Sequence, residues 1–257
     1  MFSVLFLGTC ACDYSPKLHN EYKDCFDKNA RRSSSVLVNE QYLIDCGDHC
    51  LDELRIANVN AAKITDILLT HLHSDHYNVE HIRYIASAST RTLRVWVRED
   101  AIVPELENVE WRRMQPTSVY AIEDGLTVVG LKANHNESVF PQHLLFEKGG
   151  KKFLYACDGA WFLHETYYAL KNADLSLLVL DCTCGDYEGD YRMGEHNTIP
   201  MIRVMLPSLK TWRTITENTQ TYISHLAPSL HKSHEETVKI MAELGVNVAY
   251  DGLQIEI

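Results

Sequence analysis

The strongest constraint in this sequence is a run of metal-binding side chains directly after a short apolar segment. The apolar residues 67–69 are followed by His71, His73, Asp75 and His76, within six positions. Imidazole and carboxylate groups bind zinc, iron and manganese, and this density exceeds the usual local share of one tetrahedral metal. An unliganded surface cluster is the alternative, but it would gain nothing from a buried strand before it. The run therefore predicts two adjacent metal ions at the end of a strand.

Three further candidate ligands occur downstream, and each follows a strand-like segment. Because the ends of such strands converge at one edge of a sheet, these side chains can meet the first cluster. Asp158 alone could equally be a turn residue before Gly159, so the prediction depends on the ordered set. The candidates are His135 after residues 126–131, Asp158 after residues 153–157 and His225 after residues 221–224.

Composition favours an intracellular enzyme with a single domain over residues 1–257. The first eight residues lack a basic segment and are too short for a secretory signal, and no stretch approaches membrane-spanning length. Eight cysteines without a signal sequence indicate reduced thiols or metal ligands in the cytoplasm. The net charge of −11 argues against an extended nucleic-acid surface. It leaves room for a small phosphate ester, because two dications would change the local field.

Hydrophobic patterning predicts an α/β fold of two halves, each with strands followed by helices. This order favours an αββα sandwich of two mixed β-sheets with outer helices. The polar segment 99–115 is interrupted by Pro104 and is predicted as a short helix and loops. The predicted strands are residues 1–8, 35–38, 41–45, 67–69, 93–97, 126–133, 143–146, 153–157, 175–181 and 221–224, and the predicted helices are 48–57, 78–87, 161–171, 198–206 and 233–244, the last with a capping box of Ser233 and Glu236.

The pattern of His71, His73, Asp75 and His76, with the three downstream candidates, resembles the metallo-β-lactamase superfamily. Further motifs resemble its PhnP-like branch of phosphoribosyl cyclic phosphate phosphodiesterases: residues 7–9, 31–35, 43–47, 180–182, 196–198 and 250–255. The resemblance implies the αββα fold and two divalent metal ions, zinc or manganese, with iron as an alternative. It also implies that His71, His73 and His135 hold one metal, that Asp75, His76 and His225 hold the other, and that Asp158 bridges them.

The sequence departs from that branch near its beginning. Cys10, Ala11 and Cys12 stand where the family usually has a glycine-rich loop, and Pro228 stands where the family has a zinc-binding histidine. Cys10, Cys12 and Cys25 could still form a third, structural zinc site with His19, His231 or His234 as the fourth ligand. The alternative is that these three are ordinary thiols, as the other cysteines are predicted to be.

Besides Asp75 and Asp158, His196 is a candidate catalytic residue. It precedes a predicted helix N-terminus, where backbone N–H groups favour anions, so it could contact phosphate or protonate a leaving group. The alternative is a solvent-exposed loop histidine. Asp45 and Asp181 either orient ligand histidines or merely end their strands. His81 is predicted to be an ordinary helix histidine.

These observations predict a cytoplasmic dinuclear-metal hydrolase of small or cyclic phosphodiesters. A nuclease resembling ribonuclease Z is the main alternative, although no Gly- and Lys-rich insertion is present. A thioester or lactone hydrolase is a further alternative. A non-catalytic metal-binding scaffold fits less well, because sequence drift would remove ligands first. The predicted partner is a small phosphodiester substrate, with no membrane, and a homodimer is left open.

Overall fold

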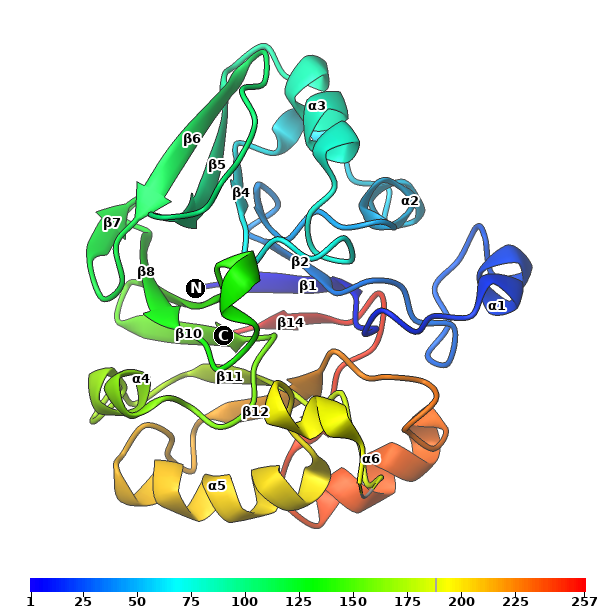
Figure 1. Ribbon diagram of the computed structural model, residues 1–257, viewed down its shortest axis with the longest axis vertical. Coiled ribbons are helices and arrows are strands. Elements are labelled where there is room, and N and C mark those ends of the chain that lie inside the picture. Colours follow the sequence, from blue (N-terminus) through cyan, green and yellow to red (C-terminus); the bar gives the residue numbers. More distant parts are fainter. Residues whose placement is uncertain (188) are drawn as a thin grey trace.

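The computed structural model describes residues 1–187 and 189–257, which form two seven-stranded β-sheets packed face to face (Figure 1). In order across the first sheet, the strands are β14 (Gln254–Glu256), β1 (Ser3–Gly8), β2 (Ser35–Val38), β3 (Tyr42–Ile44), β4 (Asp66–Leu68), β5 (Leu93–Arg98) and β6 (Val109–Met114). Across the second they are β13 (Asn247–Val248), β12 (Gln220–Ser224), β11 (Leu177–Asp181), β10 (Lys151–Ala156), β9 (Gln142–Lys148), β8 (Thr127–Lys132) and β7 (Val119–Ala121).

Helices lie outside both sheets, which confirms the predicted αββα arrangement (Figure 1). Helices α2 (Cys50–Ile56) and α3 (Val79–Ala88) flank the first sheet, while α4 (His164–Ala169), α5 (Ile199–Thr211) and α6 (His234–Ala242) cover the second. The short helix α1 (Pro16–Glu21) lies to one side. Three 3₁₀ turns complete the described elements: η1 (Ala61–Lys63), η2 (Glu137–Val139) and η3 (Tyr191–Gly194). No described helix has both the length and the apolar character needed to cross a membrane.

The core between the sheets is rich in aromatic residues. Phe6 and Tyr42 from the first sheet and Phe146, Phe153 and Tyr155 from the second belong to one buried cluster. Two further apolar clusters lie beneath the outer helices. Each sheet is therefore covered on both faces, which explains why strands such as β2 and β11 are buried along their whole length.

Strand direction brings several loops to one edge of the sandwich. β10, β11 and β12 are mutually parallel, and β8 runs the same way because it is two antiparallel steps from β10. In the first sheet, β4 is parallel to β3 and β5. Gln142, at the start of β9, connects the two sheets at this edge by hydrogen bonds. Its backbone N–H donates to the carbonyl of Thr70 (2.8 Å) and its side-chain amide to the carbonyl of Leu69 (2.9 Å).

Most predicted elements occur, but the prediction for residues 99–115 was wrong in part. Strand β6 forms there and pairs in parallel with β5 along its whole length. As an edge strand it exposes most of its polar side chains, so pairing with a neighbour outweighs a composition that suggested loops. Helix α5 extends beyond its predicted end, through Pro207 to Thr211, where buried Leu209 packs against the second sheet. The capping box of α6 is present.

A buried carboxylate makes a testable contribution to stability. Asp66 on β4 is fully buried and accepts hydrogen bonds from Arg94 (2.8 and 2.7 Å) and from the indole of Trp96 (2.7 Å). Asp66→Ala should lower the free energy of unfolding by about 2 kcal/mol, because it leaves the buried indole N–H of Trp96 without a partner and removes one of the two carboxylates that pair with Arg94. Urea denaturation measures this change. Glu110→Ala is the control, since Glu110 pairs with Arg112 on the exposed surface and should contribute no more than about 0.5 kcal/mol.

Candidate metal centre

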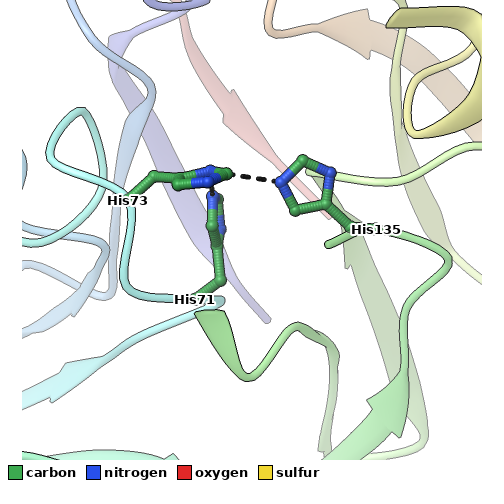
Figure 2. A group of neighbouring side chains, drawn as sticks. All are labelled: His71, His73 and His135. Carbon is green, nitrogen blue, oxygen red and sulfur yellow. Dashed lines mark hydrogen bonds between the residues drawn. The ribbon is translucent and has the colours of Figure 1, made fainter. Parts of the chain in front are cut away.

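Three histidines from two loops converge at the shared edge of the sheets. His71 and His73 follow β4, and His135 follows β8; their side chains point toward one another in Figure 2. The Nδ1 atom of His73 lies 2.9 Å from Nε2 of His71 and 3.2 Å from Nε2 of His135. Burial lowers the pKa of His71 well below its ordinary value and also lowers the pKa values of His73 and His135. The imidazoles are therefore neutral, the state that binds metal ions.

A second group of buried side chains lies beside the first. Asp75, His76, Asp158 and His225 each present an atom within 4.8 Å of the others. Nε2 of His76 lies 3.2 Å from Nε2 of His225 and 3.4 Å from Oδ2 of Asp75. Burial alone would lower the pKa of His225, but Asp158, Asp181 and Asp75 outweigh it and raise that pKa to about 10. This pocket thus favours positive charge.

Asp158 is the carboxylate that reaches both groups. Its Oδ2 lies 3.6 Å from Nε2 of His71 and 3.3 Å from Nε2 of His76, while its Oδ1 lies 3.2 Å from Nε2 of His225. Oδ1 is buried and accepts no hydrogen bond from any described residue. A buried carboxylate oxygen among imidazole nitrogens, with no hydrogen-bond donor, has the surroundings of a metal ligand. The side chains present therefore fit two metal ions.

Supporting residues orient two of the histidines. Oδ2 of Asp45 accepts a hydrogen bond from Nδ1 of His76 (2.7 Å), and Oδ1 of Asp45 accepts one from the backbone of Thr70 (2.8 Å). The hydroxyl of Thr183 accepts from Nδ1 of His225 (2.7 Å). In each case Nε2 is the nitrogen left for a metal. The sequence analysis missed Thr183, whose signal is its place two residues beyond the end of β11.

His196 joins this network and is not a solvent-exposed loop residue. It lies just before Thr198, the N-cap of α5, and is 9 % exposed. Its Nδ1 donates to Oδ2 of Asp181 (2.7 Å), and its ring stacks on that of His225 with centroids 5.5 Å apart. Asp181 therefore pairs with a site histidine rather than merely ending its strand. His81, on α3, donates to the carbonyl of Gly47 (2.9 Å), which fits its reading as an ordinary helix residue.

The structure does not bring the three candidate structural-zinc cysteines together. Cys10 is buried, Cys12 and Cys25 are exposed, and no cluster of metal-binding side chains among the described residues contains any of them. The three candidate histidines have hydrogen-bond partners elsewhere. His19 donates to the carbonyl of Arg31, His231 donates to the carbonyl of Cys182, and His234 accepts from the guanidinium of Arg31.

The two mixed sheets pack face to face with helices outside, which is the metallo-β-lactamase fold. Histidines and aspartates cluster at the shared edge of the sheets and form a candidate metal centre. The chain belongs to the β-lactamase superfamily: residues 40–250 match the family model described as "Beta-lactamase superfamily domain". This superfamily consists mainly of metal-dependent hydrolases.

Individual relatives are more distant. A segment of 102 residues is 28% identical to "Ribonuclease Z" from Pyrococcus horikoshii, and it covers 40% of this chain but only 28% of that protein. The structure is similar to the metallo-β-lactamase fold protein YhfI from Bacillus subtilis, with a TM-score of 0.75, 17% identity and coverage of 100% of this chain and 99% of that one. It is also similar to a diphosphatase of the PhnP family, with a TM-score of 0.74, 18% identity and coverage of 100% and 97%. At these identities the two structures establish the shared fold alone.

Proposed function

We propose that the chain is a dinuclear-metal phosphodiesterase that acts on small or cyclic phosphodiesters. The observation that carries this proposal is the position of Asp158, whose carboxylate lies between the two groups of histidines. His71, His73 and His135 would hold one ion, and Asp75, His76 and His225 the other, with Asp158 shared. Zinc or manganese suits these nitrogen and oxygen ligands, and iron is an alternative. Two such ions would supply a water-derived nucleophile near neutral pH and stabilise developing charge on a phosphoryl group.

The chain's own residues complete this chemistry. Asp181 accepts a hydrogen bond from Nδ1 of His196, so Nε2 is the nitrogen available to a substrate. His196 would hold a proton at Nε2 for the phosphate or for the leaving oxygen. Thr183 and Asp45 keep His225 and His76 in the orientation that ligation needs.

The likeness to a ribonuclease Z supports a second candidate, a nuclease acting on RNA. We favour a small substrate because the chain carries a net charge of −11, and counterion release from nucleic acid needs clustered lysine and arginine. Comparing purified protein on cyclic phosphodiesters, short oligonucleotides and thioesters separates the candidates. Turnover of oligonucleotides alone would replace our proposal with the nuclease, and a lack of turnover on all three would favour a scaffold.

Metal removal tests the proposal directly. Protein freed of metal by a chelator should lose hydrolysis of bis(p-nitrophenyl) phosphate and regain it when manganese or zinc is restored, with two ions bound per chain. Because metal binds the folded state, an ion at one hundred times its dissociation constant should also stabilise the protein by about 2.7 kcal/mol. Elemental analysis and thermal unfolding measure these effects independently of turnover. A stoichiometry of one ion in the active protein would contradict the dinuclear centre.

A further inference from the structure

The turn after Asp158 is a junction between the loops that carry the candidate centre. The backbone N–H of Gly159 donates to Oδ2 of Asp181 (3.3 Å), and its carbonyl accepts from the side-chain amide of Asn197 (3.0 Å). The next backbone N–H donates to the carbonyl of Asn134 (3.0 Å). Asn134 and Asn197 each adjoin a site histidine in the sequence. Any displacement of Gly159 is therefore transmitted to Asp158 and to two neighbouring loops.

The ring of His143, on β9, packs against Gly159 in this turn. Its side chain is fully buried, and its ring packs against Phe162 with centroids 5.5 Å apart. A Cβ atom added to Gly159 would lie 2.6 Å from Cε1 and 3.1 Å from Nε2 of His143. Carbon atoms pack at about 3.5 to 4.0 Å, so the ring leaves room for glycine only. Unlike the glycines of the tight turns, Gly159 does not have a positive φ, so this contact accounts for the residue type.

We propose that His143 is a positioning residue for the metal centre, acting through Gly159 on the bridging carboxylate of Asp158. Neither ring nitrogen of His143 has a hydrogen-bond partner among the described residues, so the ring acts by its shape. Because a close-packed interior is nearly incompressible, a displacement at this contact shifts the neighbouring atoms as well. Metal sites in turn require their ligands to be held within a fraction of an ångström. This inference depends on the two-metal centre of the proposed function.

A double-mutant cycle between Gly159 and His143 tests the contact. Gly159→Ala should weaken binding of the second metal ion by about 10- to 100-fold, the range for residues that support metal ligands. His143→Ala alone should also weaken binding, because the turn loses the ring that packs against it. In the double variant the new methyl group takes the place of the ring, so binding should be tighter than in either single variant. Affinities are measured on metal-free protein by titration with cobalt or zinc against a competing chelator. His164→Ala, which removes an exposed histidine on α4, is the matched control.

The outcomes distinguish this inference from the proposed function. Wild-type affinity in Gly159→Ala, or a double variant as weak as Gly159→Ala, would overturn the positioning role while leaving the metal centre intact. Failure of the wild-type chain to bind two ions would overturn both proposals. The melting temperature of each metal-free variant reports whether it folds. If Gly159→Ala does not fold, His143→Phe becomes the test, because its larger ring should push the turn and weaken metal binding. Unchanged affinity in that variant would overturn the role.

Discussion

Replacing Asp158 with alanine is expected to abolish phosphodiester hydrolysis and to reduce metal content from two ions per chain to one or none. The reason is that Asp158 is the carboxylate within 3.6 Å of histidines from both groups. Its removal deprives each site of an anionic ligand and leaves the nitrogens of His76 and His225 facing each other. Turnover of bis(p-nitrophenyl) phosphate and elemental analysis measure the two effects.

The fold should survive this substitution, because Asp158 is a site residue and belongs to none of the apolar clusters. Circular dichroism of the metal-free variant checks this point. Glu165→Ala provides a control that removes an exposed carboxylate paired with Lys132. Two bound ions together with a wild-type rate in Asp158→Ala would rule out the bridging role.

Local sequence signals predicted which side chains would lie together because most of them are concentrated in short segments. His71, His73 and His76 are separated by two and three positions on one loop, so the short stretch of chain between them keeps them close in space. His135 and His225 required one further step, that strand ends meet at one edge of a sheet. The αββα arrangement followed from the order of strands and helices in the two halves.

Features that depend on contacts between distant segments were not accessible in this way. Strand β6 forms because β5 offers an edge to pair with, although three of the six residues of β6 are charged. The contact of His143 with Gly159 joins β9 to the turn after β10, and neither residue has a distinguishing pattern. The structure does not support the predicted structural zinc site, because Cys10 is buried while Cys12 and Cys25 are exposed. The spacing of the cysteines in the sequence could not show this difference.

Replacing His196 with alanine should lower the rate of hydrolysis by about 10² to 10⁴, the range for a positioned acid or base. Metal content should stay unchanged, since His196 belongs to neither proposed ligand set. The hydrogen bond from its Nδ1 to Asp181 fixes the ring, so alanine removes a group that is already oriented. Steady-state rates and elemental analysis of the variant measure both quantities, with His164→Ala as the control.

The leaving group decides which role His196 has. A nitrophenolate departs without needing a proton, so a pure general acid should matter much less for a nitrophenyl diester than for an alkyl diester. A residue that positions the phosphate should matter for both. Buried Asp181 beside the ring favours the acid role, because a carboxylate at Nδ1 stabilises the protonated imidazole from which Nε2 donates. We therefore expect a large loss on the alkyl diester and a small loss on the nitrophenyl diester. Equal losses would assign His196 to phosphate binding, and unchanged rates on both substrates would remove it from the reaction.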